Sequence, residues 1–512
     1  MNWEDINPYQ IMINYKYVEP RAYQLNIAKS IYAGYNTLIV LPTGLGKTLI
    51  AVLAIAKVLY ENRRAMLLAP TKPLAEQHYA YVSKMLNINS RDILLLTGTT
   101  KANEREKKEF DARVIVATPQ TIANDLKLGR FMMDNFAIAI FDECHKAIGK
   151  YAYTYIANEC KLRHIQIVGL TASPGSNKKK ITQLVEILGI EKIEARTSTD
   201  PDVRPYVMDK TTKIVYLENN DVILTIMEKL RPIINEHLGK LYSYGLSPFK
   251  SFENVPKRKL LELGKIISKI EAKNFMFMAI YNYVYVINLM HAYELISTEG
   301  LYPFVSYFDA LAAREKKSKA LQNILANQDI VYSIDIARKA LDRGVEHPKM
   351  FMTVKIIKNE LKDKSVIVFA QYRSTIKKIV EILSSNQIDA KAFVGKKEGI
   401  TQASQQQVIK DFREGKFKVL VATSIGEEGL DIPSVDTVIF YEPVASEIRN
   451  IQRRGRAGRI ATGHIIVLVT KRTKDEAYLM ASISKERKMK EEIEKISMHM
   501  HESKKTIGQQ RL

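Results

Sequence analysis

Cysteine is scarce in this chain of 512 residues, which contains only Cys144 and Cys160. Two cysteines cannot build a disulfide framework, which excludes small disulfide-stabilised secreted proteins and favours a reducing compartment. The sequence also lacks an apolar run long enough to cross a bilayer, and residues 1–20 lack the apolar core of a signal peptide. We therefore expect a soluble, cytoplasmic protein without a membrane span.

Acidic residues are outnumbered, since 77 lysines and arginines stand against 56 aspartates and glutamates and give a net charge of +21. A balance this basic favours a polyanionic partner, although a lysine-rich chain with solvated faces would carry the same charge. The chain is longer than one hydrophobic core usually organises, which predicts about three domains.

Short apolar runs alternate with helical patterns over residues 37–174. The runs are nearly continuous in Ile, Val and Leu, which is typical of strands buried on both faces of a parallel sheet. Polar clusters follow them, at the carboxyl ends where ligands bind in such sheets. The expected strands are residues 37–40, 65–68, 93–96, 114–117, 137–141 and 165–170.

Long helical patterns replace this alternation between residues 201 and 348 and predict a helical insertion domain. Basic residues recur there, with Phe275 and Phe277 among the interleaved aromatic residues. Stacking on bases is one role for such aromatics. The spacing of Tyr281, Tyr283 and Tyr285 fits the insertion's own core at least as well.

The alternation returns in the C-terminal part and predicts a second α/β domain, with strands at residues 365–370, 418–422, 437–440 and 464–469. The last residues are charged, with Lys-Glu spacings typical of a solvated helix. The predicted domains are a first α/β domain at 1–200, the helical insertion at 201–348, the second α/β domain at 349–475 and a charged helical tail at 476–512.

The stretch from Leu41 to Thr48 lies between an apolar run and a helical pattern, which is the context of a phosphate-binding loop. Its glycines let backbone N–H groups face an anion, and the following helix N-terminus adds about half a positive charge. Lys47 can reach the outer phosphates and the Thr48 hydroxyl can ligate Mg²⁺. Leu41 departs from the general pattern, which has glycine there, and an ordinary strand–helix turn is the alternative. The predicted nucleotide contacts are Thr43, Gly44, Gly46, Lys47 and Thr48.

Two adjacent carboxylates, Asp142 and Glu143, follow a later apolar run. We expect Asp142 to hold Mg²⁺ through its water shell, and Glu143 to orient and deprotonate the attacking water of nucleotide hydrolysis. A surface turn is the alternative for an isolated Asp-Glu pair. Cys144 is interpreted as a packing residue, and His145 as a hydrogen-bonded connector because no metal-ligand spacing surrounds it.

An arginine-rich stretch at residues 452–459 begins a helical pattern after a predicted strand and loop. Arg456 and Arg459 are three residues apart and therefore share a helical face. Guanidinium groups stabilise the charge on a transferred phosphoryl group and can raise its rate about 10³–10⁵-fold. A solvated basic helix is the alternative interpretation.

Three motifs resemble those of superfamily 2 helicases and occur in the order found in that superfamily. They are Asp-Glu-Cys-His at 142–145, Thr-Ala-Ser at 171–173 and Gln-x-x-Gly-Arg-x-Gly-Arg at 452–459. The resemblance implies that Gln452, Arg456 and Arg459 complete the catalytic site from the second domain. It also implies that Thr171 and Ser173, together with His145, couple hydrolysis to domain movement.

Four stretches resemble archaeal Hef, a branched-DNA helicase related to the Fanconi-anaemia M translocase: residues 41–48, 69–74, 169–175 and 201–206. This resemblance covers nearly the whole chain and implies an α/β fold of two RecA-like parallel-sheet motor domains with an all-α insertion domain between them. It implies ATP and Mg²⁺ as cofactors. It further implies an ATP-dependent DNA helicase or translocase that acts on forked or branched DNA in replication-fork repair and recombination. The expected partners are forked, branched or single-stranded DNA and repair proteins.

The same resemblance assigns contacts to single residues of this sequence. Arg21 and Gln24 are similar to an adenine-reading motif, in which Gln suits the N6/N7 edge of adenine. Gly429 and Asp431 are the nucleotide contacts implied for the second domain. The residues implied to grip the nucleic-acid backbone are Pro70, Thr71, Lys72, Gly98, Thr99, Thr118, Pro119, Gln371, Arg373 and Thr423.

Departures from the Hef pattern keep alternatives open. Cys144 stands where Hef sequences commonly have Ala and gives the spelling seen in innate-immune RNA-sensor helicases. An RNA helicase or double-stranded-RNA translocase is therefore the alternative function. A nucleic-acid scaffold with an idle ATPase is a further class, which the intact Lys47, Glu143 and Arg459 argue against. Residues 486–488, Glu-Arg-Lys, resemble part of a Hef nuclease signature but lack the following Asp, so we expect no nuclease activity.

Overall fold

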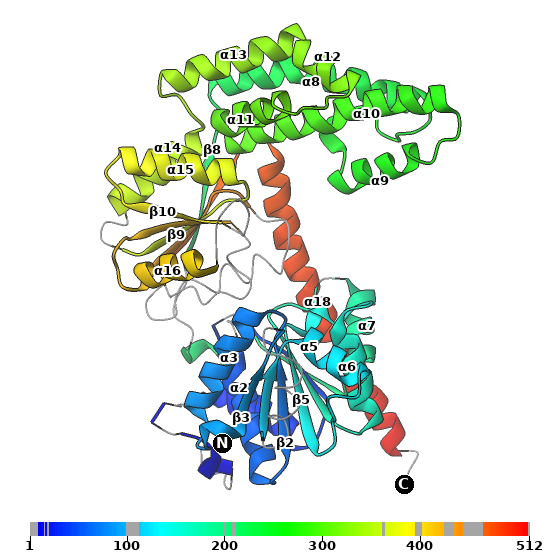
Figure 1. Cartoon of the computed structure of the whole chain (residues 1–512), viewed down its shortest axis with the longest axis vertical. Helices are drawn as coiled ribbons and strands as arrows, with labels where there is room; N and C mark the ends of the chain where they lie inside the picture. The colour runs from blue at the N-terminus through cyan, green and yellow to red at the C-terminus, as the bar shows by residue number, and fades with distance from the viewer. Residues whose placement is uncertain are drawn as a thin grey trace.

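The computed structural model contains two α/β domains and a helical domain. Figure 1 shows the first α/β domain at the foot, the second at the upper left and the helical domain across the top. The structure describes residues 9–14, 16–17, 20–42, 44–98, 112–175, 177–197, 200–206, 211–360, 364–394, 402–423, 435–443 and 464–509.

Seven strands form the first sheet, in the order β3-β4-β2-β5-β6-β1-β7, and every neighbouring pair is parallel. The six expected strands are all present, and β7 is an edge strand that the sequence analysis did not predict. The strands are β1 (Thr37–Val40), β2 (Arg64–Leu68), β3 (Ile93–Leu96), β4 (Val114–Ala117), β5 (Phe136–Asp142), β6 (Gln166–Thr171) and β7 (Lys192–Ala195).

Helices cover both faces of this sheet because successive strand residues point to opposite sides. Leu38 and Val40 lie in the core on one face, and Ile39 lies in the core on the other. The face that includes Ile39 carries α1 (Ala22–Tyr32), α2 (Lys47–Tyr60) and α3 (Lys72–Met85). The opposite face carries α5 (Pro119–Lys127), α6 (Ala152–Leu162) and α7 (Lys178–Leu188).

The second sheet has six strands in the order β10-β11-β9-β12-β13-β8, again with parallel pairs. They are β8 (Thr211–Leu217), β9 (Val366–Phe369), β10 (Ala390–Phe393), β11 (Val419–Ala422), β12 (Thr437–Phe440) and β13 (His464–Thr470). The helices in the described part of this domain are α14 (Pro348–Lys355), followed by a π-turn at Ile356–Glu360, α15 (Arg373–Ser385) and α16 (Gln402–Arg413). Two parallel-sheet domains are therefore present, and the expected fold class is confirmed.

Strand β8 corrects the domain boundary that the sequence analysis placed at residue 201. It pairs with β13 from Thr211 and His464 onward, although it precedes the helical domain in the chain. The helical domain is thus inserted into the second α/β domain and begins after β8. The strand lacks a continuous apolar run because it lies at a sheet edge, where Ile214 and Tyr216 are exposed.

The insertion consists of helices around a core of its own. Its long helix α10, with the π-turn that continues it, is long and apolar enough by length and composition to cross a membrane. Its buried residues Val286 and Leu289 pack in the insertion core, as in an ordinary core helix. The absence of a membrane span remains a prediction. The helices are α8 (Asp221–Ser243), α9 (Lys257–Ile267), α10 (Lys273–Glu294), α11 (Leu301–Ala312), α12 (Lys319–Ala326) and α13 (Gln328–Asp342).

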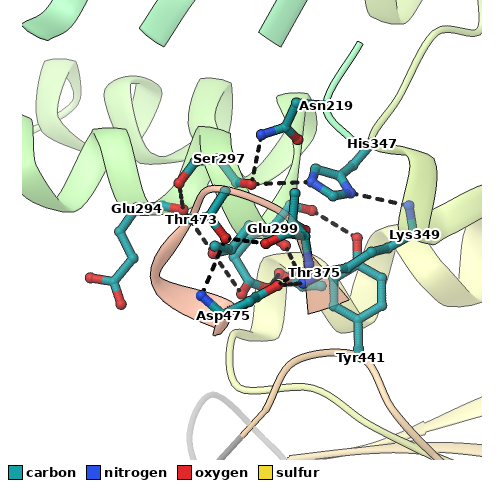
Figure 2. Close-up of polar contacts among 12 residues, drawn as sticks. Asn219, Glu294, Ser297, Glu299, His347, Lys349, Thr375, Tyr441, Thr473 and Asp475 are labelled. Atoms are coloured by element: carbon teal, nitrogen blue, oxygen red, sulfur yellow. Dashed lines mark hydrogen bonds and ion pairs between the residues drawn. The ribbon is translucent and has the colours of Figure 1, made fainter. Parts of the chain in front are cut away.

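A buried polar network joins the insertion to the second α/β domain (Figure 2). Glu299 ends the π-turn Leu295–Glu299, and its carboxylate accepts a hydrogen bond from the Thr375 hydroxyl of α15 at 2.8 Å. Its backbone carbonyl accepts one from the Tyr441 hydroxyl at 3.0 Å. The fully buried Lys349 of α14 donates to the Thr298 carbonyl at 3.1 Å and pairs with Asp475 at 2.5 Å. These contacts fix the end of α10 to the second domain.

The C-terminal helix α18 (Lys474–Gln509) is not the solvated tail that its charged sequence predicted. Leu479 lies in the core of the second domain, whereas Met489 and Ile493 are buried in the core of the first. In Figure 1 the helix runs from the insertion junction down along the first domain. Met489, Ile493 and Ile496 recur at helical spacing, and they form the apolar face that binds this helix to the first domain.

Replacing Glu299 with Gln should raise stability at alkaline pH. Burial raises the pKa of Glu299 to about 7 against the opposing effects of Lys349 and Thr375. The ordinary pKa of a glutamate is 4.5. Between pH 4.5 and about 7, Glu299 therefore keeps a proton in the folded protein that it has lost in the unfolded chain. Stability therefore falls as pH rises through this window. Glu299→Gln removes that titration, so we expect a flatter pH profile and a gain of roughly 1–3 kcal/mol at pH 8.

Melting temperatures measured between pH 5 and pH 8 check this prediction. The exposed carboxylate of Glu315 supplies the matched control, since Glu315→Gln removes a charge from the insertion surface and should leave the pH profile unchanged. A Glu299→Gln profile that parallels the parent would contradict the assignment.

Candidate functional site

The phosphate loop connects β1 to α2 and depends on two left-handed glycines, Gly44 at φ +89° and Gly46 at φ +72°. A Cβ atom on Gly46 would lie 2.3 Å from Gln24 Nε2. The Leu45 carbonyl accepts hydrogen bonds from the Tyr23 hydroxyl at 2.7 Å and from Gln24 Nε2 at 3.2 Å. Helix α1 therefore holds the loop from behind, at the N-terminus of α2, which is the end of a helix that favours anions.

Leu41 and Lys47 show how the loop accommodates its departure from the general pattern. The Leu41 side chain is fully buried in the core, and its carbonyl accepts a hydrogen bond from Lys47 Nζ at 2.9 Å. The ammonium group is thus already held over the loop by a main-chain oxygen. Thr48, the second residue of α2, is half-buried beside it.

Asp142 ends β5 as a buried, ionised carboxylate. His78 of α3 approaches its Oδ2 with Nε2 at 2.7 Å, and the Tyr153 hydroxyl donates to its carbonyl at 2.7 Å. Burial alone raises the pKa of Asp142, but His78 and then Lys47 outweigh it and hold the pKa below its usual value. The carboxylate is therefore charged at neutral pH.

Glu143 lies just beyond the strand with φ +48°, a left-handed conformation that non-glycine residues adopt mostly at functional sites and turns. Its Oε2 lies 3.3 Å from Nδ1 of His145, and the same ring nitrogen lies 3.0 Å from the Thr171 hydroxyl. The Thr171 hydroxyl accepts the Ser173 backbone N–H at 3.1 Å. The structure therefore brings Glu143, His145, Thr171 and Ser173 into one continuous run of polar contacts.

The oxygen donors at this edge fit a magnesium ion bound together with nucleotide. The charged Asp142 carboxylate and the Thr48 hydroxyl are hard oxygen ligands, which Mg²⁺ prefers. No cluster of three or more His, Cys, Asp or Glu that could hold a metal occurs in the described part of the chain. Mg²⁺ sites built on nucleotide characteristically use one or two protein ligands with phosphates and water, so the residues fit.

The predicted nucleic-acid contacts lie at helix N-termini and strand ends. Thr71 precedes α3, which begins at Lys72, and Thr118 precedes α5, which begins at Pro119. Gln371 and Arg373 flank the start of α15. The others follow strand ends: Pro70 after β2, Gly98 after β3 and Thr423 after β11. Free N–H groups at helix N-termini attract phosphate, as a backbone grip requires.

Two hydroxyls in this set lack a hydrogen-bond partner in the described part of the chain. The hydroxyl oxygens of Thr71 and Thr423 are buried and have no hydrogen-bond partner among the described residues. A buried hydroxyl without a partner costs roughly 1–3 kcal/mol, which a phosphate oxygen would relieve. Thr71 belongs to the first α/β domain and Thr423 to the second. A nucleic-acid strand that contacts both residues would therefore link the two domains.

Strand order sorts the predicted contacts into two groups. The nucleotide motifs follow the adjacent strands β5, β6 and β1, and the nucleic-acid motifs of this domain follow the adjacent strands β3, β4 and β2. Strand β2 pairs with β5, so the two groups meet between these strands. The seven predicted site residues outside the described part of the chain are Thr43, Thr99, Gly429, Asp431, Gln452, Arg456 and Arg459, and their roles remain predictions.

The adenine-reading pair takes part in local structure. Gln24 Oε1 accepts the Arg21 backbone N–H at 2.8 Å, and its amide nitrogen is bonded to the phosphate loop. The Arg21 guanidinium lies over the Tyr206 ring, 5.5 Å from its centroid. Gln24 thus supports the phosphate loop through a hydrogen bond, whereas its contact with adenine remains a prediction.

His78 and Tyr153 are site residues that sequence reasoning missed. A signal for His78 was present, because Ala75, His78, Val82 and Met85 form the buried face of α3 at helical spacing. A polar residue on such a face needs a buried partner, and here that partner is Asp142.

The solved helicase domain of Pyrococcus furiosus Hef is 40% identical to this chain, covers 92% of it and is itself covered completely, with a TM-score of 0.73. The chain belongs to the Hef family of superfamily 2 helicases. This Hef-family chain also matches the DEAD/DEAH box helicase family over residues 21–181 and the helicase conserved C-terminal domain over residues 348–461. Its domains are thus those of ATP-hydrolysing helicases.

Two curated relatives extend the comparison. A Methanocaldococcus jannaschii protein, described provisionally as an ATP-dependent RNA helicase, is 38% identical over 488 residues, which are 94% of the Hef-family chain and 61% of the relative. The ATP-dependent DNA helicase MPH1 of Pyricularia oryzae is 34% identical over 500 residues, which are 92% of this chain and 45% of the relative. The chain therefore spans less than two thirds of either relative.

Substituting Ala for Gly46 should weaken nucleotide binding in this Hef-family chain. The new Cβ would meet Gln24 at 2.3 Å and impose backbone strain, which misplaces the N–H groups of the loop. We expect nucleotide affinity to fall by about tenfold or more, equivalent to roughly 1.4 kcal/mol or more.

Titration with a fluorescent ATP analogue measures this effect. Gly34 is a matched control, since its φ is +85° and a Cβ there meets no atom within 4 Å, so Gly34→Ala brings strain without the clash. Parent-like affinity in Gly46→Ala, or an equal loss in Gly34→Ala, would contradict this account of the loop.

Proposed function

We propose that this chain is an ATP-dependent DNA helicase or translocase that acts on forked or branched DNA in replication-fork repair and recombination. The observation that supports the proposal most strongly is the strand order of the first sheet. It brings a phosphate loop and two carboxylates beside a row of helix N-termini suited to a nucleic-acid backbone. We also propose that the protein acts in the cytoplasm and has repair proteins as partners.

Hydrolysis would use residues at the ends of β1 and β5. Lys47 and the N-terminus of α2 bind the triphosphate, and Asp142 and Thr48 would hold Mg²⁺, which neutralises phosphate charge when bound. Glu143 orients the attacking water and accepts its proton. Gln452, Arg456 and Arg459 would approach from the second domain, where the guanidinium groups of the two arginines would stabilise the transferred phosphoryl group.

The polar run from Glu143 to Ser173 would carry the state of the nucleotide to the domain interface. Glu143 and Thr171 contact the same nitrogen of His145, so a change at the γ-phosphate alters the contacts of Thr171. Ser173 leads onward, since its hydroxyl lies 2.7 Å from Met489 Sδ of α18, the helix that also packs on the second domain. Hydrolysis and domain movement would be coupled along this route.

The insertion would hold the duplex beside the fork through α9 and the start of α10. Lys265 on α9 and Lys269, two residues beyond its end, are exposed, and Phe277 is 62% exposed on α10. Tyr285 instead stacks on His237 with ring centroids 3.7 Å apart, and the hydroxyl of Tyr281 accepts a hydrogen bond from Asn323. The tyrosines therefore serve the insertion core, and we assign any base stacking to Phe277, where it would contribute about 1–3 kcal/mol.

RNA is the second candidate substrate, because the Methanocaldococcus relative is described as an RNA helicase. Cys144 does not help to distinguish a DNA substrate from an RNA substrate, because its side chain is buried. Its sulfur packs so closely on Gly169 that a Cβ on that glycine would lie 2.9 Å from it. Burial also raises the pKa of the Cys144 thiol well above its ordinary value, so it is a packing residue. Competition between forked DNA and an RNA duplex in one unwinding assay distinguishes the substrates.

The catalytic assignment predicts that Glu143→Gln binds ATP but hydrolyses it slowly. Loss of a general base lowers the rate by about 10²–10⁴-fold. Lys47→Ala should lose both binding and hydrolysis, because its ammonium reaches the outer phosphates. Nucleic-acid-stimulated ATPase rates and ATP-analogue affinities check both variants, and unchanged melting temperatures control for folding. Parent-like hydrolysis by Glu143→Gln would refute the assignment.

The insertion assignment predicts that Lys265→Ala/Lys269→Ala weakens fork binding and reduces its salt dependence. Each lost phosphate contact lowers the slope of log affinity against log salt by about 0.9, so two give about 1.8. Lys410→Ala/Lys495→Ala removes two charges that are 66% exposed on other helices and should leave the slope unchanged. Binding isotherms over a salt series measure both, and equal slopes in parent and α9 variant would exclude α9 from the substrate path.

A further inference from the structure

Helix α3 touches both groups of predicted contacts. Its first residue is Lys72, preceded by Thr71, and both belong to the nucleic-acid grip. Six residues farther on, His78 is 5% exposed and hydrogen-bonds to the Asp142 carboxylate at 2.7 Å. One helix thus connects the strand-binding edge to the residue that would hold Mg²⁺.

The sheet explains why this helix can make the connection. Strand β2, which leads into α3, is the neighbour of β5, and Leu68 at its end pairs with Phe141, the residue before Asp142. From Lys72 to His78 the helix rises about 9 Å at 1.5 Å per residue. Ala75 and Val82 are buried on either side of His78, so the helix is seated in the core and moves as a rigid element.

The geometry leaves His78 a definite role at the carboxylate. The imidazole engages one oxygen of Asp142, Oδ2, and so fixes the rotation of the carboxylate and the direction of its other oxygen. Partners of this kind orient ligands of metal sites, and their loss typically weakens metal affinity about 10–100-fold. If a nucleic-acid strand that binds at Thr71 shifts α3, His78 moves with the helix and rotates the Asp142 carboxylate.

We propose that His78 is a positioning residue that couples the grip of α3 on a nucleic-acid strand to the orientation of Asp142 toward nucleotide-bound Mg²⁺. This inference rests on the proposed function, because it requires that the edge at Thr71 binds nucleic acid and the edge at Asp142 binds Mg²⁺ with ATP. The inference adds His78, and a path through α3 that connects nucleic-acid binding to nucleotide binding within the first α/β domain.

Two polar substitutions test the inference. In His78→Gln the amide nitrogen reaches about as far as Nε2 of the imidazole and should still bond to Asp142. In His78→Asn the side chain is one bond shorter and should not reach it. Both are small polar changes at a buried site, and His237→Asn, which removes a buried histidine hydrogen-bonded to Asn282 at 2.8 Å in the insertion, is the matched control.

The readout is binding of nucleotide and DNA, without turnover. We expect His78→Asn to raise the Mg²⁺ concentration for half-maximal binding of a non-hydrolysable fluorescent ATP analogue about 10-fold or more. In the parent, bound Mg²⁺ and ATP analogue should change the protein's affinity for single-stranded DNA. By thermodynamic linkage, bound DNA then changes the protein's affinity for the nucleotide by the same factor. In His78→Asn that factor should approach one while DNA affinity without nucleotide is unchanged, and His78→Gln should restore it.

The outcomes separate the inference from the function on which it rests. A parent that shows neither DNA-stimulated hydrolysis nor DNA-linked nucleotide binding would overturn the proposed function. A parent that shows both, with His78→Asn retaining parent-like Mg²⁺ dependence and linkage, would overturn the role of His78. An equal loss of linkage in His237→Asn would also overturn it, because the effect would then be a general consequence of losing a buried histidine.

Discussion

The proposed role of the Asp142 carboxylate depends on one constraint, which is that parallel strands end at one edge of the first sheet. The strand order places β5, a strand of the nucleotide group, directly beside β2, a strand of the nucleic-acid group that leads into α3. His78 approaches the carboxylate from one group and Lys47 influences it from the other, which keeps it charged despite its burial. A fold with these motifs on distant strands would have no shared residue through which two ligands could influence each other.

The remaining elements determine which parts can move relative to one another. Lys349, Glu299 and Asp475 attach the insertion to the second α/β domain through buried contacts, so these two parts form one body. Helix α18 spans both bodies, since Leu479 lies in the core of the second domain and Met489 in the core of the first. The α/β domains can approach each other only if α18 bends between these residues or shifts where it packs.

The sequence predicted most of the fold, and it predicted that the phosphate loop and Asp142 lie at strand ends, because both depend on local patterns. Strands buried on two faces are continuous apolar runs, and the phosphate loop and Asp142 directly follow such runs. The missed strands β7, β8 and β10 all lie at sheet edges, where exposure breaks the run. His78 and the buried face of α18 were missed because helical spacing does not name the partner of a buried face, and only the tertiary contacts show what each one packs against.

We propose that the two α/β domains close together on a nucleotide and a nucleic-acid strand. Pulsed electron paramagnetic resonance between spin labels at the exposed positions Asn124 on α5 and Ser384 on α15 measures it directly. The native Cys144 and Cys160 are buried and should not take up label. The account predicts a shorter distance when forked DNA and a non-hydrolysable ATP analogue are both present, and no such shift in Lys47→Ala. An unchanged distance distribution in the fully liganded parent would contradict it.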